Sequence, residues 1–349
     1  MRKTWWKNRS NSDMGFNRPV RRSTVSLGIS VLSAFIFMTV FSGAVQAKSL
    51  MLGHTVPPTH VWHKVATKFS ENLAAASQDK MKIQVTPLSK LGNEPQMFSM
   101  VQSDAIAFSI LPVGFLSNRE ESLLGWFLPY QFLDVKEAGA VASVPAAKQM
   151  LKNLEPHGVI GLGYMFAGMQ HILSMKAVVK PDDLVNKKVR SFPSPIFNDW
   201  LLGLGAAPTA LPLAEVAPSL STNLLDAAAV DLDIIVGLKY HQQAKFLALT
   251  NHMAFPAILI TSKKWWDGLP QADKDMIQKA YAEAEKFGLE SQIAAEVANL
   301  EKLKQDGVTV TQIDMAAFKE KAMSVKENYI AKNPLIKQFS NEVEGVLKK

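Results

Sequence analysis

The sequence predicts an α/β protein built as two lobes, with one long helix spanning both. Strand-like and helix-like segments alternate through most of the chain, which is typical of mostly parallel sheets covered by helices. The chain has 349 residues, enough for two lobes of ordinary domain size. A helical pattern of about 35 residues near the C-terminus would extend roughly 50 Å, which is longer than one lobe.

The first 47 residues predict a signal peptide. Residues 1–24 carry seven basic residues against one acidic residue, and an apolar stretch follows over residues 25–45. Val45-Gln46-Ala47 places small side chains where signal peptidase cuts. The alternative is an uncleaved membrane anchor, since the apolar run approaches spanning length. Cleavage after Ala47 would leave 302 of the 349 residues in the periplasm and lower the net charge from +7 to +1, so no nucleic-acid partner is expected.

Short strands and one early helix are predicted in the rest of the chain. Apolar residues recur every fourth position from Val61 to Leu73, which predicts a helix with one buried face. Strands are predicted at residues 50–52, 83–85, 105–108, 159–164, 188–190, 227–232 and 257–261.

The long helix has a recognisable start and end. Pro270 suits a first helical position, and Asp273 in the first turn favours the helix dipole. An apolar stripe continues until Asp306-Gly307, which should end the helix. Gly288 is a candidate site for a bend between the two lobes.

The chemistry of most enzyme classes is missing from the sequence. There is no cysteine, which excludes disulfides, thiolate catalysis and cysteine metal sites. Residues 161–163 and 203–205 both read GLG, but neither has the third glycine of a dinucleotide loop. No phosphate loop, nucleophile elbow or zinc-binding helix motif is present. We therefore expect neither a cofactor nor an enzyme.

A few polar residues could suit a metal ion, but other roles fit them better. His60 and His63 lie three residues apart at a helix start, with His54 shortly before them. With no fourth ligand in view, they are interpreted as ordinary loop and helix-cap histidines. Asp231 and Asp233 could hold a hard cation, but a carboxylate pair at a strand end is more often solvated surface. No metal site is predicted.

The central part of the chain carries a set of motifs in a fixed order. Residues 182–195 read DDLVNKKVRSFPSP, followed by LGAAPT at 204–209 and LPLAEV at 211–216. This stretch resembles the signature of DctP-type solute-binding proteins of TRAP transporters, roughly D-L-K-G-x-K-x-R-x-P-x-S and then L-G-A-x-P-x-x-x-x-x-x-E-V. Similar fragments occur in order on both sides, namely LGNE at 91–94, LPYQF at 128–132, ALTNH at 248–252 and KKWWDGLP at 263–270.

The resemblance implies a two-lobe periplasmic-binding-protein fold whose lobes close on a ligand by hinge bending. Lobe I would comprise residues 48–167 with 256–295, and lobe II residues 168–255 with 296–349. The resemblance also implies a monomer that delivers a small organic acid to a TRAP membrane permease driven by an ion gradient.

Arg190 is the strongest candidate for binding the ligand. An arginine fork binds a carboxylate through two hydrogen bonds and keeps its charge. Apart from Arg119, Arg190 is the only arginine after residue 47, and it lies in an apolar segment flanked by prolines. The alternative is an exposed surface arginine. Phe166, Trp62 and Trp200 are candidates for stacking on a ligand, although core packing is the commoner role of such residues.

Other positions depart from the pattern that the resemblance provides. Gln170 stands where relatives often have a second arginine, and Pro112 where some have a carboxylate. Asp226 is kept, whereas Ala229 and Val230 replace polar ligand contacts. The predicted ligand-binding residues are therefore Arg190, Gln170, Phe166, Asp226, Val230 and Trp62. Such a cleft favours a ligand with one carboxylate and a mainly apolar or aromatic remainder.

Two other functions fit the same sequence. A receptor that feeds a sensor kinase would use the same ligand site without a permease. A secreted enzyme on this scaffold would need an acid–base pair or a nucleophile, and no motif in the sequence supplies one.

Overall fold

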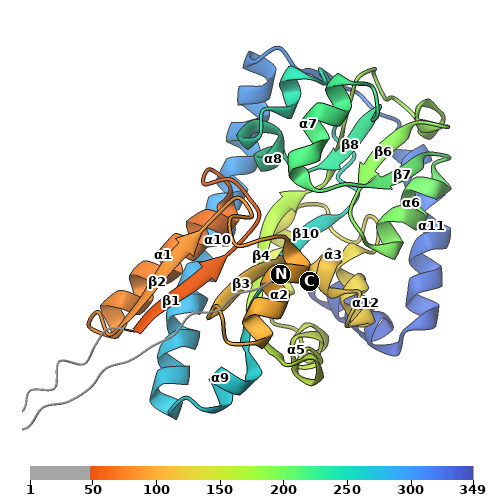
Figure 1. Ribbon diagram of the computed structural model, residues 1–349. Coiled ribbons are helices and arrows are strands. Elements are labelled where there is room, and N and C mark those ends of the chain that lie inside the picture. Colours follow the sequence, from red (N-terminus) through yellow and green to blue (C-terminus); the bar gives the residue numbers. More distant parts are fainter. Residues whose placement is uncertain (1–47, 349) are drawn as a thin grey trace, which may run out of the picture. The chain divides into compact units, whose positions relative to one another are not determined.

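The computed structural model describes residues 48–348, and the predicted signal peptide lies outside these residues. They form a mixed α/β fold around two β-sheets (Figure 1). Within residues 48–348, none of the helices combines the length and the apolar character needed to cross a bilayer.

The first sheet has five strands and defines the first lobe. Its order is β2 (Met81–Thr86), β1 (Lys48–Gly53), β3 (Phe108–Pro112), β10 (Ala254–Ser262) and β4 (Val159–Met169). Strand β1 pairs in parallel with β2 and β3, whereas β10 runs antiparallel to β3 and β4. Every residue of β10 is buried, as expected for an apolar strand covered on both faces. The strand predicted at 105–108 begins only at Phe108, because residues before it form a turn.

The second sheet has six strands and defines the second lobe. Its order is β11 (Thr309–Thr311), β9 (Phe246–Ala248), β5 (His171–Ser174), β8 (Ala227–Val230), β6 (Lys188–Ser191) and β7 (Ala207–Ala210). Strands β8, β6 and β7 are parallel, and β5 is antiparallel to both of its neighbours. Strand β8 ends two residues earlier than predicted, since Leu232 already begins the next helix.

Two segments connect the sheets, and they are hydrogen-bonded to each other. The chain leaves the first sheet at Gln170, between β4 and β5, and returns through residues 249–253 between β9 and β10. The backbone N–H of Gln170 donates to the carbonyl of Met253 at 2.8 Å, and His252 donates to the carbonyl of Gln170 at 3.2 Å. The crossings lie within a few residues of the predicted boundaries at 167/168 and 255/256.

Helices cover both sheets. In the first lobe these are α1 (Val61–Ala76), α2 (Glu94–Gln102), α3 (Val113–Leu116), α4 (Val135–Ala140), α5 (Pro145–Lys152) and α9 (Lys263–Asp267), with 3₁₀ turns η1 (Glu121–Phe127) and η2 (Glu155–His157). In the second lobe they are α6 (Pro195–Gly203), α7 (Leu213–Ser221) and α8 (Leu232–Gly237), with η3 (Pro181–Leu184) and η4 (Tyr240–Gln242).

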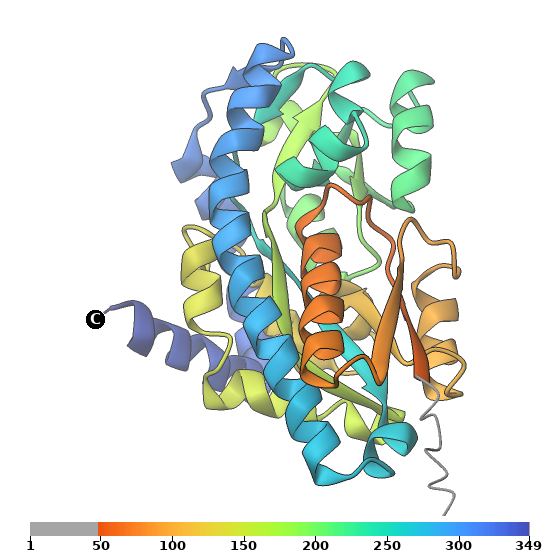
Figure 2. The same ribbon diagram turned by 90° about the vertical axis from the view of Figure 1, so that its left-hand side faces the viewer.

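Helix α10 (Gln271–Gln305) confirms the predicted long helix, with Pro270 and Asp306 as its caps. It packs against α1 and β4 of the first lobe and against α8 of the second (Figure 2). Two of its carboxylates accept hydrogen bonds from the backbone of β4. Glu285 Oε1 binds the N–H of Tyr164, and Glu296 Oε1 binds that of Met169, both at 3.2 Å. Burial raises the pKa of each carboxyl to about 7.

Gly288 lies inside this helix where α10 meets α1. A Cβ atom at this position would lie 2.3 Å from Val65 Cγ2. The glycine therefore permits close approach of two helices, a role different from the bend that we considered from the sequence.

We expect Gly288→Ala to destabilise the protein by about 1–3 kcal/mol, because the added methyl overpacks the contact with Val65. Helix propensity alone would give a gain of about 1 kcal/mol. Gly345→Ala in the C-terminal helix is the matched control, since its Cβ would meet nothing within 4 Å. Urea unfolding of both variants, and of Gly288→Ala combined with Val65→Ala, measures the effect. A stabilised Gly288→Ala protein would contradict the packing argument.

The C-terminal helices divide between the lobes. Helix α11 (Met315–Lys332) packs on α6 of the second lobe, whereas α12 (Pro334–Leu347) packs on η1 and α5 of the first. The Phe339 ring lies 4.7 Å from the Trp126 ring, and Glu342 accepts a hydrogen bond from the Ala146 N–H at 2.8 Å. This differs from the predicted assignment of all of residues 296–349 to lobe II. Periodicity indicates that a helix has a buried face, but it does not indicate which partner covers that face.

Candidate functional site

A cavity of about 410 Å³ lies between the two lobes. The first lobe contributes side chains from the β1–α1 loop, the start of α1 and β10, and the second contributes the ends of β6 and β8 and the β7–α7 connection. The lining includes Val56, His60, Trp62, Pro112, Phe115, Asn118, Arg190, Phe192, Leu211, Leu213, Val230, Asp231, Ile234 and Phe255. This is within the size range of pockets that bind small molecules.

Arg190 supplies the positive charge of this cavity. It lies on β6 between β8 and β7, opposite Ala228 and Thr209, and is only 3% exposed. Its Nε donates to the Leu211 carbonyl at 3.1 Å, and Nη1 to the Ala229 carbonyl at 3.2 Å. The Phe192 ring stacks on the guanidinium, with Cζ 4.0 Å from the ring centre.

No carboxylate of residues 48–348 forms an ion pair with Arg190. Burial lowers its pKa to about 10, so the guanidinium remains charged at neutral pH. A buried cation without a counter-charge is costly. An anionic ligand in the cavity would remove that cost, which makes this group suited to binding a carboxylate.

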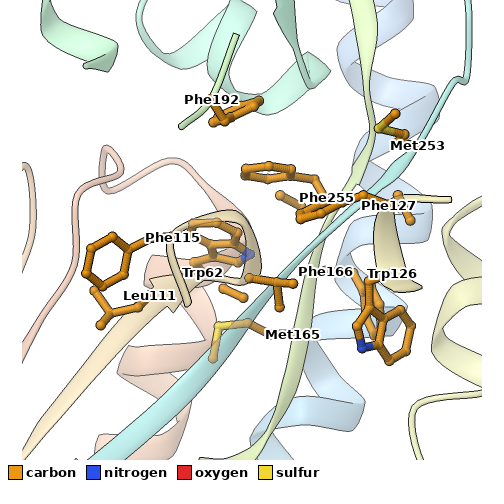
Figure 3. Close-up of a cluster of buried hydrophobic side chains, with 14 of the residues drawn as sticks. Trp62, Leu111, Phe115, Trp126, Phe127, Met165, Phe166, Phe192, Met253 and Phe255 are labelled. Atoms are coloured by element: carbon orange, nitrogen blue, oxygen red, sulfur yellow. The ribbon is translucent and has the colours of Figure 1, made fainter. Parts of the chain in front are cut away.

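Aromatic side chains form an apolar wall in the cavity. The Phe192 ring lies 4.3 Å from that of Phe255, and Trp62 stacks on Phe255 with 5.9 Å between ring centres. Figure 3 shows these rings near one another, with Phe115 beside Trp62. A ligand carbon chain packed here would be desolvated, which favours binding of apolar groups.

Asp231 and His60 are, with Arg190, the buried polar side chains of a lining that also includes Thr55, Asn93, Glu94 and Asn118. Asp231 caps α8, and its Oδ1 accepts from the Ile234 N–H at 2.9 Å. His60 caps α1, and its Nδ1 accepts from the Trp62 N–H at 3.1 Å. Burial raises the pKa of Asp231 to about 8, with a further contribution from Asp233. Burial also lowers the pKa of His60 well below its usual value. Neither side chain is therefore expected to be charged at neutral pH.

Three of the six predicted ligand-binding residues line the cavity, namely Arg190, Val230 and Trp62. Gln170 lies behind Asp231 and donates from Nε2 to its Oδ2 at 3.4 Å. Phe166 instead packs on Trp126, with 5.5 Å between the ring centres, and Figure 3 shows these two side chains away from Phe192.

Asp226 has a different position and contact. It lies just before β8, and its Oδ2 accepts from the Lys188 N–H at 2.8 Å. This joins the starts of β8 and β6, whereas the cavity lies at the other ends of these strands. Trp200 is also outside the lining and stacks on His252 at 3.9 Å.

Sequence reasoning missed the cavity roles of Asp231, His60, Phe192 and Phe255. The expectation that Asp231 and Asp233 are solvated was wrong, since both are buried. Helix α1 covers Asp233, whose Oδ2 accepts from the Val61 N–H at 3.2 Å. Alternation of apolar and polar residues cannot reveal this, because the covering element is distant in sequence.

Two hydrogen bonds between protein atoms join the lobes beside the cavity. One is the Val61–Asp233 contact, which joins α1 to α8. In the other, Asn118 Nδ2 donates to the carbonyl of Pro193 at 3.0 Å. Both contacts hold the two lobes together, and both are made by protein atoms alone.

The three histidines of the α1 region do not converge on one point. His54 Nε2 and His63 Nδ1 lie 3.0 Å apart, whereas His60 lies near Asp231. No group of three or more potential metal-ligating side chains occurs in the described part of the chain.

These features define a class, the two-lobe proteins with a cavity between two sheets that are joined by crossing strands. The chain belongs to one such family, described as "Bacterial extracellular solute-binding protein, family 7" (DctP), whose model matches residues 52–333. This is a family of periplasmic binding proteins and not of enzymes. The predicted fold and the resemblance to DctP-type proteins are thereby confirmed.

Relatives in this family are named for different acids. The 2,3-diketo-L-gulonate-binding periplasmic protein of Escherichia coli is 26% identical over 86% of this chain and 91% of its own length. The C4-dicarboxylate-binding periplasmic protein of Rhodobacter capsulatus is 26% identical over 83% and 90%. A TRAP periplasmic solute-binding protein of Xanthobacter autotrophicus, solved with bound β-D-galacturonate, has a TM-score of 0.80 and 25% identity. That comparison covers 85% of this chain and 99% of the other.

Proposed function

We propose that this protein captures a small organic carboxylate in the cavity between its lobes and delivers it to a TRAP membrane permease. The observation that carries the proposal is Arg190, a buried cation in the cavity wall that has no ion-pair partner among residues 48–348. The relatives' names support an acid as ligand. Delivery to a permease driven by an ion gradient follows from the family's role in TRAP transport.

The remaining parts of the proposal concern location and mode of action. Residues 1–47 act as a cleaved signal peptide, so the mature chain works in the periplasm as a monomeric receptor without a cofactor. It binds its ligand without converting it, as expected for a member of a family of solute-binding proteins.

The ligand that suits this cavity has one carboxylate and a mainly apolar remainder. Arg190 is the cationic side chain of the lining, and aromatic and aliphatic residues form most of the rest. A second ligand carboxylate would be desolvated without a cationic partner, at a cost of several kcal/mol. An apolar group beside Phe192 and Phe255 would instead gain roughly 25 cal/mol for each Å² buried.

We expect 3-methylbutanoate to bind at least tenfold more tightly than succinate or malate. Thermal-shift screening followed by isothermal titration calorimetry measures the affinities, since a ligand that binds the folded state raises its melting temperature. Tenfold tighter binding of either dicarboxylate would contradict the apolar-cavity proposal. Arg190→Met in the same assay tests whether the bound acid depends on this residue.

A further inference from the structure

Arg190, on β6, and Asp231, directly after the neighbouring strand β8, both line the cavity. Arg190 Nη1 binds the carbonyl of Ala229, two residues before Asp231. A ligand whose carboxylate is held by Arg190 therefore lies in a cavity that Asp231 also lines.

His60 faces Asp231 with a defined hydrogen-bonding role. Its Nδ1 accepts from the Trp62 N–H, so a neutral ring carries its proton on Nε2. This atom lies 3.8 Å from Asp231 Oδ1, which is too far for a direct hydrogen bond. An oxygen atom about 2.8 Å from each would bridge the two groups.

The carboxyl group of Asp231 is held firmly in this position. Oδ1 accepts from the Ile234 N–H, and Oδ2 from Gln170 behind it. Asp231 is 2% and His60 is 1% exposed. Buried polar groups with spare hydrogen-bonding capacity discriminate strongly between ligands that satisfy them and ligands that do not.

We propose that Asp231 and His60 form a second polar subsite, which binds a hydroxyl group on carbon 2 or 3 of the carboxylate ligand. This inference rests on the proposed function. The hydroxyl oxygen accepts a hydrogen bond from His60 Nε2 and donates its own proton to Asp231. The ligand class is thereby narrowed to hydroxy monocarboxylates with an apolar remainder.

A hydroxyl fits the subsite better than an ammonium group does. The ammonium would be a second cation in a buried cavity that already contains Arg190. It would also meet a carboxyl group that burial keeps protonated at neutral pH. A hydroxyl both accepts and donates, so it satisfies His60 and Asp231 without any change in charge.

The test uses four acids of the same carbon skeleton on the mature protein. These are 3-methylbutanoate, its 2-hydroxy and 3-hydroxy derivatives, and valine. We expect one hydroxy acid to bind roughly tenfold or more tightly than 3-methylbutanoate, and valine to bind more weakly than that hydroxy acid. Calorimetry gives the ratio of the dissociation constants.

Two variants keep the helix caps while removing the subsite. They are His60→Asn and Asp231→Ser, since asparagine and serine are both favourable N-cap residues. We expect each variant to lose most of the preference for the hydroxy acid, measured as the ratio of the dissociation constants of 3-methylbutanoate and the hydroxy acid in the same variant. Asp226→Asn is the matched control, because Asp226 binds the Lys188 N–H at the other end of β8, outside the cavity. It should preserve the preference.

The results distinguish a failure of the subsite proposal from a failure of the proposed function. Binding of 3-methylbutanoate that depends on Arg190, with no gain from either hydroxyl, contradicts the subsite alone. Tightest binding by valine also contradicts it, as does an unchanged hydroxyl preference in both variants. A protein that binds none of the four acids contradicts both proposals.

Discussion

Arg190→Lys should bind the ligand acid about 30-fold to 1,000-fold more weakly than wild type, and Arg190→Ala more weakly still. This corresponds to a loss of about 2–4 kcal/mol for a charge-assisted contact to a desolvated carboxylate. The arginine donates to the carbonyls of Leu211 and Ala229 while stacking on Phe192, and its remaining N–H groups are free for the ligand. A lysine ammonium lacks the planar fork that can stack on Phe192, bind the two carbonyls and still offer two N–H groups to a carboxylate.

Calorimetry with 3-methylbutanoate and its hydroxy derivatives measures the effect on the variants. Lys188→Ala is the matched control, because Lys188 is an exposed cation on the same strand β6 and lies outside the cavity lining. Affinities of both Arg190 variants within a few-fold of wild type would remove Arg190 from the site.

Replacing both Glu285 and Glu296 by glutamine should stabilise the protein, and this gain over the wild type should grow as the pH rises from about 5 to 8. Burial raises the pKa of both carboxyl groups from 4.5 to about 7. Between these two pH values the folded state holds more protons on Glu285 and Glu296 than the unfolded state does. The contribution of these two groups to the free energy of unfolding therefore decreases as the pH rises. Each glutamine keeps an oxygen that can accept the hydrogen bond from the N–H of Tyr164 or Met169. Each substitution should raise the free energy of unfolding by about 1–3 kcal/mol at pH 8.

Urea unfolding at pH 5, 6, 7 and 8 measures this dependence. Asp231 contributes a slope of the same sign up to about pH 8. His60 and His171, whose pKa values burial lowers, contribute a slope of the opposite sign below about pH 6.5, so the effect is measured as the difference between the double variant and the wild type. Glu290→Gln changes an exposed residue of the same helix and serves as the control. Equal slopes in the wild type and the double variant would contradict the assignment of buried, protonated carboxyls.

Much of the fold could be predicted because its signals are local. The start of α10 at Pro270, its end at Asp306 and the face of α1 from Val61 to Leu73 all follow from caps and periodicity. Arg190 could be singled out because it is a rare residue type in an apolar setting. These features depend on neighbours within a few residues along the chain.

The rest of the site could not be predicted, because it depends on elements far apart in the sequence. Phe255 and Phe192 lie on different lobes and meet only in the folded protein. Asp226 and Asp231 flank the same short strand, yet only Asp231 lies at the end that faces the cavity. The sequence predicted Asp226 as a ligand contact, whereas the direction of β8 brings Asp231 to the cavity instead.

The Val61–Asp233 and Asn118–Pro193 hydrogen bonds have a consequence for kinetics. Because both use only protein atoms, they favour contact between the lobes whether or not a ligand is present. If the ligand enters when these bonds are broken, its association rate is the encounter rate multiplied by the fraction of time for which they are broken. The same bonds must break before the ligand leaves. The protein thus gains residence time for its cargo at the cost of capture speed, and a membrane partner that separates the lobes would accelerate release.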